Sequence, residues 1–223
     1  MIEFVVTSDG SKTLYHAEIG EHYHSRHGAV QESKHVFLSM GLRHFLESQH
    51  PDAVSILEVG FGTGLNFLLS ADYCRLNGVA LDYTGVEAFP LSATVISQTG
   101  YDAYVSQGLW ASFLSRYTDS LRTVQQIHDT CQLEVAQCEA LQFSTVKLFD
   151  VLYFDAFAAI RQPAMWTEET LRHVCTFLKP GGIFVTYAIT GHLKRCMKGL
   201  GFTIEKVQGA PGKREMLRAI KTS

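Results

Sequence analysis

The chain has 223 residues, 46% of them hydrophobic, so it can bury one substantial core and its length fits a single domain. No apolar run approaches the roughly 18 residues of a membrane-spanning helix, and the amino terminus lacks the basic-then-apolar layout of an export signal. We therefore expect a cytoplasmic protein with no membrane partner. The five cysteines are odd in number and contain no CxxC, which argues against a disulfide framework and a thiolate zinc site.

The net charge of −3 hides a strong asymmetry along the chain. Residues 1–178 contain 10 Lys or Arg and 20 Asp or Glu, whereas residues 179–223 contain 9 and 2, which gives local charges of −10 and +7. A basic region of this size can bind a polyanion such as nucleic acid. An ordinary solvated surface explains the same composition equally well.

The first 50 residues are predicted to form a small hairpin and a helix. Two β-rich runs flank a Ser-Asp-Gly-Ser turn, which predicts a hairpin over residues 3–15. Apolar positions recur at helical spacing over residues 28–46, before Pro51. We interpret residues 1–50 as an amino-terminal extension and residues 51–223 as the core of one domain.

From residue 51 onward, short strands and helices alternate. Apolar runs predict strands over residues 54–59, 80–86, 133–136, 151–154 and 183–187, and helices over residues 65–76, 91–98 and 167–178. Residues 106–129 show no clear period, and short helices with a loop are expected there. The alternation implies parallel strands with right-handed crossovers and helices on both faces.

The carboxyl-terminal residues break this alternation. Strand-like runs over residues 202–208 and 216–220 flank the turn Gly-Ala-Pro-Gly, so a hairpin replaces another crossover. A parallel sheet with an antiparallel edge strand is typical of class I methyltransferases, which use S-adenosylmethionine. The sequence therefore predicts a Rossmann-like α/β fold with a seven-stranded, mostly parallel sheet.

The glycine-rich turn EVGFGTG, residues 58–64, is the candidate cofactor site. It lies where the first core strand becomes a helix, and ligands bind beyond the carboxyl ends of such strands. Its spacing differs from the G-x-G-x-x-G of dinucleotide sites, where the helix terminus faces a pyrophosphate. Glu58 is expected to accept a hydrogen bond from the amino group of S-adenosylmethionine, and backbone amides near Thr63 are expected to bind its carboxylate. The residues assigned to this part of the site are Glu58, Gly60, Phe61, Gly62, Thr63, Gly64 and Asn66.

Further acidic positions complete the predicted cofactor site. Glu87 ends the second core strand, where a carboxylate can accept hydrogen bonds from both ribose hydroxyls. Glu139, next to Cys138, follows the third strand at the position expected for contact with the adenine amine. Each signal alone also fits an ordinary turn or a solvated carboxylate, but together their spacing favours cofactor binding.

Asp155 ends the fourth core strand and is the predicted catalytic residue. Methyl transfer from a sulfonium is an in-line displacement, so an amine acceptor must be uncharged and aligned with the carbon–sulfur bond. A carboxylate can orient an N–H and accept the released proton. A partly dry pocket also disfavours the charge of an ammonium group. The alternative is that Asp155 only caps the loop that follows it.

The segments GFGTGLNF (60–67), DAFAAIRQPAMW (155–166) and GKREML (212–217) occur together in this chain. With them the chain resembles the methyltransferases that finish the 5-methylaminomethyl group on the wobble uridine of bacterial tRNA, and residues 23–37 are similar to that family's upstream motif. The resemblance implies methylation of the primary amine of 5-aminomethyl-(2-thio)uridine, with Asp155 as the active-site aspartate. The chain departs from the family in this loop, because Ala156 and Ala159 replace the commoner glycine and proline.

The resemblance also implies a partner, the anticodon stem-loop of tRNA, held through phosphates with the wobble base flipped onto aromatic rings. In many bacteria the activity is half of a bifunctional enzyme with a flavin oxidase. This chain resembles the free-standing form, so a separate oxidase or aminomethylating enzyme is expected to supply its substrate. The candidate substrate contacts are Lys194, Arg195, Lys198, Lys213 and Arg214 for phosphates, Phe61, Phe157 and Trp166 for stacking, and His27 and Glu32 from the upstream motif.

Other interpretations stay open. Four histidines crowd residues 16–27, but they have no clear fourth ligand, so no metal is expected. Trp166 fits the core as well as a stacking position, and Glu32 fits an exposed helical acid. The same fold also suits a methyltransferase or aminopropyltransferase-like enzyme that acts on a free small amine. A catalytically silent module that binds S-adenosylmethionine and RNA is the third possibility.

Overall fold

The computed structural model describes residues 2–222, and its centre is an eight-stranded sheet with the order β10-β11-β9-β8-β4-β5-β7-β6. The middle five strands are parallel neighbours, and β11 runs antiparallel to both β9 and β10. The predicted parallel sheet with a carboxyl-terminal antiparallel hairpin is confirmed. The strand bounds are β4 (Ala53–Val59), β5 (Ala80–Val86), β7 (Cys131–Ala136), β8 (Phe149–Phe154), β9 (Leu178–Thr186), β10 (Phe202–Gln208) and β11 (Glu215–Lys221).

The eighth strand is one more than predicted. β6 (Gln125–His128) pairs antiparallel with β7 and shifts register between Gln126 and His128. It follows α5 (Gln107–Ser120), a 14-residue helix in the stretch where short helices and a loop were expected. Within β6 only Ile127 is buried, so this edge strand has no alternating apolar pattern that a sequence could reveal.

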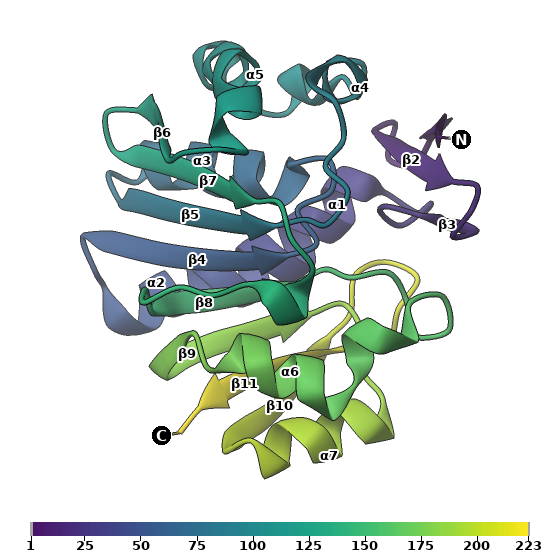
Figure 1. The fold of residues 1–223 in the computed structure, drawn as a ribbon, viewed down its shortest axis with the longest axis vertical. Coiled ribbons are helices and arrows are strands. Elements are labelled where there is room, and N and C mark those ends of the chain that lie inside the picture. Colours follow the sequence, from purple (N-terminus) through teal and green to yellow (C-terminus); the bar gives the residue numbers. More distant parts are fainter. Residues whose placement is uncertain (1, 223) are drawn as a thin grey trace.

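Helices cover the two faces of the sheet unequally (Figure 1). α3 (Leu65–Leu76) and α5 pack on one face, and α6 (Glu168–Cys175) and α7 (Gly191–Gly199) lie in front of the half formed by β9, β11 and β10. Between β7 and β8 the described chain forms only the short 3-10 turn η3 (Ala140–Gln142). Helix α4 (Ala93–Ser97) is shorter than predicted, and the 3-10 turns η2 (Tyr101–Ala103) and η4 (Pro163–Trp166) precede α5 and α6.

The amino-terminal extension forms its own small sheet and a long helix. The strands β1 (Ile2–Val6), β2 (Lys12–His16) and β3 (Glu21–His22) make a three-stranded antiparallel sheet, one strand larger than the predicted hairpin. The helix runs through α1 (Ala29–Ser33), the π-helical segment η1 (Lys34–Arg43) and α2 (His44–Gln49). A Cβ at Gly41 would lie 2.9 Å from Val185 and 3.0 Å from Tyr153, so this glycine lets the helix pack closely on β9 and β8.

Segments near both ends of the described chain lie at the sheet edge formed by the carboxyl ends of the parallel strands. The small amino-terminal sheet lies beside that edge, on the same side as the yellow turn between β10 and β11 (Figure 1). The two segments touch, because a Cβ at Gly212 of the turn would lie 2.7 Å from the ring of His27. Within residues 2–222, no helix combines the length and apolar character needed to cross a membrane.

Candidate active site

The glycine-rich turn between β4 and α3 forms one wall of a cavity of about 260 Å³. Gly60 and Gly62 both have positive φ, +90° and +51°. A Cβ at Gly60 would lie 2.5 Å from the backbone oxygen of Asp155, and one at Gly62 would lie 3.1 Å from the ring of Tyr23. The turn therefore requires glycine for its conformation and for the close approach of its neighbours.

The cavity lies at the carboxyl ends of the parallel strands, where an α/β sheet binds its ligands. Its walls come from the glycine-rich turn, the ends of β5 and β7, the loop after β8 and the small amino-terminal sheet. Seven residues of the predicted site line it together: Gly60, Gly62, Glu87, Cys138, Glu139, Asp155 and Phe157.

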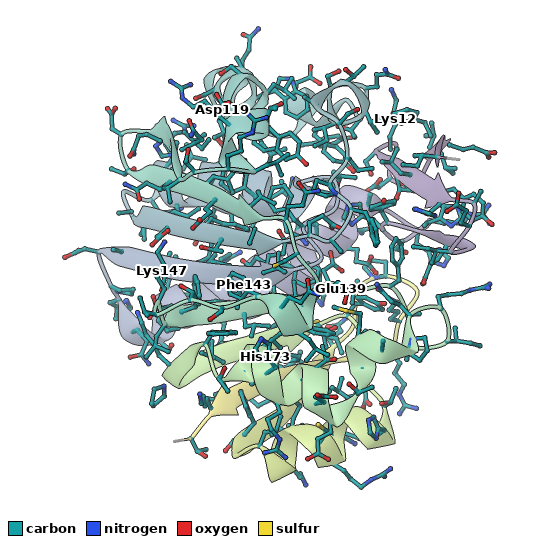
Figure 2. All side chains as sticks on the ribbon, viewed as in Figure 1. Lys12, Asp119, Glu139, Phe143, Lys147 and His173 are labelled. Carbon is teal, nitrogen blue, oxygen red and sulfur yellow. The ribbon has the colours of Figure 1, made fainter. Side chains whose placement is uncertain are left out.

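Glu87 is held by backbone donors at the cavity wall. Its Oε2 accepts a hydrogen bond from the Gly62 amide at 3.0 Å, and its Oε1 accepts one from the Phe89 amide at 3.0 Å. A carboxylate oxygen has a second lone pair, so Glu87 can still accept hydrogen bonds from two hydroxyls. Glu139 lies exposed at the cavity rim, at the same sheet edge (Figure 2). The close-fitting glycine turn and these two carboxylates fit a cofactor that carries a nucleoside.

Glu58 lies beneath the turn and is fully buried. Its two oxygens accept hydrogen bonds from Asn66 Nδ2 at 2.7 Å and from the Tyr83 hydroxyl at 2.8 Å. Burial, together with the neighbouring Asp155 carboxylate, raises the pKa of Glu58 well above its usual range. Glu58 does not line the cavity, and its predicted contact with the amino group of the cofactor stays a prediction.

Asn66 connects Glu58 to the predicted catalytic residue. The same Nδ2 that serves Glu58 donates to Asp155 Oδ2 at 2.8 Å, and the Ser33 hydroxyl donates to the Asn66 side-chain oxygen. Asn66 is 2% exposed, so this network is shielded from water. It fixes Oδ2 of Asp155, and within residues 2–222 no protein group donates a hydrogen bond to Oδ1.

Asp155 is half-buried where β8 ends at the cavity. Burial, reinforced by the nearby Glu32 carboxylate, raises the pKa of Asp155 to about 8, although the Asn66 hydrogen bond and the Lys213 charge act in the opposite direction. A more basic carboxylate takes a proton from an ammonium group at a smaller free-energy cost than an ordinary aspartate does. The site thus has a proton acceptor suited to amine chemistry.

Aromatic rings form the wall beside Asp155. The Phe157 ring lies edge-on to Tyr23, with centroids 5.2 Å apart, and 6.3 Å from the ring of His16. All three line the cavity. Burial raises the pKa of Tyr23 to about 12, so its hydroxyl stays neutral near pH 7. Tyr23 and His16 were not among the predicted site residues, although Tyr23 begins the upstream motif that the sequence revealed.

The loop after Asp155 is held from two sides. Glu21 Oε2, from β3, accepts a hydrogen bond from the Ala158 amide at 2.9 Å. The Tyr187 hydroxyl donates to the Ala156 backbone oxygen at 2.9 Å. These contacts span 137 and 31 residues of sequence, so neither partner is recognisable from a local motif. They fix the backbone on either side of Phe157.

Two predicted stacking residues belong to the core instead. Phe61 is 2% exposed, and its ring stacks against Tyr117 with centroids 6.1 Å apart. Trp166 is 6% exposed, packs edge-on to Phe154 and donates a hydrogen bond from Nε1 to the Phe157 backbone oxygen at 2.7 Å. Neither ring lines the cavity, so their burial favours a core position for both, which is the alternative that the sequence left open for Trp166. Of the three predicted stacking rings, only that of Phe157 faces the cavity.

The crowded histidines separate in the structure. His24 Nε2 lies 2.9 Å from the hydroxyl of Thr63 under the glycine turn, and burial lowers the pKa of His24 to about 4. His27 is exposed and packs against Gly212. Over residues 2–222, no group of three or more His, Cys, Asp and Glu side chains is arranged to hold a metal ion.

The basic residues assigned to tRNA lie in two places. On α7, Arg195 and Lys198 are exposed and Lys194 is half-buried. Arg214 is exposed in the turn before β11. Lys213, its neighbour, forms an ion pair with Glu32, with Nζ 3.1 Å from Oε2, so its ammonium group is already engaged by protein.

A comparison with family models matches residues 104–222 to a family described as S-adenosyl-L-methionine-dependent methyltransferase. The chain is 30% identical over 220 residues to the tRNA 5-methylaminomethyl-2-thiouridine biosynthesis bifunctional protein MnmC of Methylobacillus flagellatus, covering 91% of this chain and 33% of that protein. It is 31% identical to the protein of the same name from Nitrosospira multiformis, covering 92% and 35%. The chain therefore spans about a third of the length of these relatives.

Solved structures show the same architecture. The crystal structure of MNMC2 from Aquifex aeolicus matches with a TM-score of 0.78 at 23% identity, covering 98% of this chain and 70% of that one. DesVI of Streptomyces venezuelae matches with a TM-score of 0.52 at 13% identity, covering 86% and 92%. At these identities the likeness shows the fold alone, and the predicted class I methyltransferase fold is confirmed.

Proposed function

Because the chain belongs to the S-adenosyl-L-methionine-dependent methyltransferase family, we propose that it methylates the primary amine of 5-aminomethyl-(2-thio)uridine at the wobble position of tRNA. The product is 5-methylaminomethyl-(2-thio)uridine. The names of the relatives that align with about nine tenths of the chain support this choice. The observation that carries the chemistry is Asp155, whose carboxyl lies in the cavity with a pKa raised to about 8.

S-Adenosyl-L-methionine is the cofactor of this family, and when bound it supplies an electrophilic methyl group. Gly60 and Gly62 offer it a backbone surface, and Glu87 offers two acceptors for ribose hydroxyls. Cys138 and Glu139 flank the position proposed for adenine. The other residues of the predicted cofactor set, namely Glu58, Phe61, Thr63, Gly64 and Asn66, support the turn from beneath or line its backbone.

Asp155 prepares the acceptor by taking up a proton. A primary alkylamine is mostly an ammonium ion at neutral pH, by analogy with lysine, and has no lone pair for attack in that form. Asn66 holds Oδ2 of Asp155, so Oδ1 is available to accept the ammonium proton. The neutral amine would then form its bond to the methyl carbon as the carbon–sulfur bond breaks, with S-adenosylhomocysteine as the leaving group. The methylated product leaves as a secondary ammonium ion, and Asp155 releases its proton to solvent. Phe157 and Tyr23 limit the access of water to this proton transfer.

The same two rings offer a surface for a planar base, and we propose that the flipped uracil lies against them. The anticodon stem-loop would then contact the exposed cations of α7 and Arg214 through phosphates. We propose that a flavin oxidase or an aminomethylating enzyme supplies the aminomethyl substrate, in the cytoplasm where tRNA is modified. One domain, with residues 51–223 as its core, carries both binding sites in this proposal.

The test is methyl transfer from S-adenosylmethionine with a labelled methyl group, followed by nucleoside mass spectrometry. With tRNA that contains the aminomethyl precursor we expect labelled 5-methylaminomethyl-(2-thio)uridine, and with matched tRNA that lacks the precursor we expect no label. Asp155→Asn should lower kcat by about 10²- to 10⁴-fold while cofactor binding survives. Labelling of a free amine but not tRNA would favour the small-amine enzyme. Binding of cofactor and tRNA with no wild-type turnover would favour the silent module.

A further inference from the structure

Lys213 is exposed, but its ammonium group is engaged by two side chains of the protein. Its Nζ lies 3.1 Å from Glu32 Oε2 and 3.9 Å from the centroid of the Tyr187 ring. Glu32 is only 8% exposed, and its other oxygen accepts a hydrogen bond from the Ser25 amide at 2.9 Å. The ammonium group is thus bound by one buried carboxylate and one aromatic face.

The turn that carries Lys213 is fixed by its own backbone. The Lys213 amide donates to the Ala210 oxygen at 2.8 Å, and the Gly209 amide donates to the Arg214 oxygen at 3.2 Å. A Cβ at Gly209 would lie 2.5 Å from the Lys213 backbone oxygen. Ala210 is 1% exposed, so the turn is anchored in the protein. The position of Lys213 therefore follows from a packed turn.

The charged and titratable groups that act on Asp155 come from several elements. Glu32 of α1 raises the pKa of Asp155, and Lys213 lowers it. Burial is the main cause of the raised pKa values of Glu58 on β4 and of Tyr187 after β9. The Asp155 carboxylate is the second cause in both cases. In this acid-rich surrounding, Lys213 supplies a positive charge.

We propose that Lys213 is a positioning residue of the active site, whose ammonium group balances the charge of Glu32 and so keeps the Asp155 carboxyl available as a proton acceptor. The inference rests on the proposed function for its consequence in catalysis. It differs from the interpretation of Lys213 as a phosphate contact, because a lysine engaged with Glu32 and Tyr187 has less freedom to bind tRNA. Arg214 is the matched neighbour, being exposed in the same turn.

The first measurement needs neither cofactor nor tRNA. In the 223-residue protein labelled with ¹³C at aspartate side chains, the Asp155 signal is assigned by its loss in Asp155→Asn and titrated with pH. We expect Lys213→Met to raise the pKa of Asp155 by about half a unit or more, because a nearby positive charge is lost. We expect Glu32→Gln, which is isosteric, to lower it. Lys213→Arg should restore the wild-type value, and Arg214→Met should leave it unchanged.

The second measurement is the pH dependence of tRNA methylation. The acidic limb of kcat/KM should move to higher pH in Lys213→Met, so that activity near pH 7 falls by about 3- to 10-fold and recovers near pH 9.5. In Arg214→Met the acidic limb of the kcat/KM profile should stay at its wild-type pH, even where KM for tRNA rises.

Two results would overturn the inference. One is an unchanged Asp155 titration in both Lys213→Met and Glu32→Gln. The other is an equal rise of KM in Lys213→Met and Arg214→Met with no movement of the limb, which would identify Lys213 as a phosphate contact. If Lys213→Met does not fold, the pKa of Asp155 in Glu32→Gln tests the inference, and an unchanged value there overturns it. If wild-type protein shows no tRNA methylation, the proposed function fails while the carboxyl titration still tests Lys213.

Discussion

Asn66 joins two acids through one amide group. Its Nδ2 donates to Glu58 and to Asp155, and Tyr83 and Ser33 complete the hydrogen bonds of this network. Burial is the main reason why the pKa of Glu58 is raised, and the nearby Asp155 carboxylate adds to it, whereas burial and Glu32 raise the pKa of Asp155. The Asn66 hydrogen bond fixes the side chain of Asp155, while burial and Glu32 raise the affinity of that carboxylate for a proton.

The raised pKa of Asp155 has a consequence for stability. An aspartate that titrates at about 8 in the folded state and at 3.8 in the unfolded chain binds more protons when folded, so its contribution favours folding below about pH 4 and is lost as pH rises through 8. Asp155→Asn keeps the shape without this cost. We expect the melting temperatures of variant and wild type to agree near pH 4 and the variant to be more stable at pH 9, by about 1–3 kcal/mol.

Calorimetry of the cofactor-free protein across this pH range checks that expectation, with Asp102→Asn as a control at a solvent-exposed position. If the stability difference between Asp155→Asn and wild type is the same at pH 4 and at pH 9, Asp155 titrates at an ordinary value.

At the scale of elements, the sequence predicted those strands whose pattern depends on burial. β4 and β5 were located within a residue because nearly all of their carboxyl-terminal residues are buried on both faces. β6 was missed because it is polar and short. The π-helical segment η1 was also missed, since its apolar positions differ little from those of an α-helix. Hydrophobic periodicity reports burial and gives little information on exposed edges.

The loop between β8 and α6 gives a prediction at the same scale. Glu21 of β3 holds the Ala158 amide, so the small amino-terminal sheet anchors the loop that carries Phe157. Glu21→Ala should loosen this loop and raise KM for tRNA by about 2- to 10-fold, the cost of one such hydrogen bond. Cofactor affinity should change little, because Gly60, Gly62 and Glu87 are held by other contacts.

Steady-state kinetics with isothermal titration of cofactor measures both quantities for Glu21→Ala. Glu3→Ala is the control, since Glu3 is exposed on the same small sheet. A loss of cofactor affinity equal to the rise in KM would contradict a role confined to the loop.

For the whole molecule, five of the nine basic residues of positions 179–223 lie on α7 and in the β10–β11 turn. Replacing Lys194, Arg195 and Lys198 by Gln should weaken tRNA binding and reduce the slope of log K against log salt by about 0.7–0.9 for each lost phosphate contact. Filter binding at several salt concentrations measures this slope. Arg43→Gln and Arg75→Gln are controls, because both arginines lie away from α7 and pair with an acidic side chain three or four residues away. An equal loss in these variants would indicate a nonspecific charge effect.

The candidate site was predictable where its residues form one local motif. Gly60, Gly62 and Glu87 follow from the strand-to-helix pattern, and Asp155 from the end of β8. The partners of Asp155 were not recognised as such, because Asn66 lies 89 residues away and Glu32 meets Lys213 across 181 residues. Such contacts depend on tertiary folding. Lys213 was assigned to phosphates because sequence shows its charge but not its direction.

The contact between His27 and Gly212 also has a consequence for synthesis of the protein. A ribosome makes Glu32 before Lys213, so a nascent chain lacks the ion pair between these two side chains until residue 213 has emerged. Formation of this ion pair closes a loop of 181 residues, and non-local closure of this kind is slow. Messages that stop before residue 213 would yield polypeptides with the glycine turn and Asp155 but without the balancing cation.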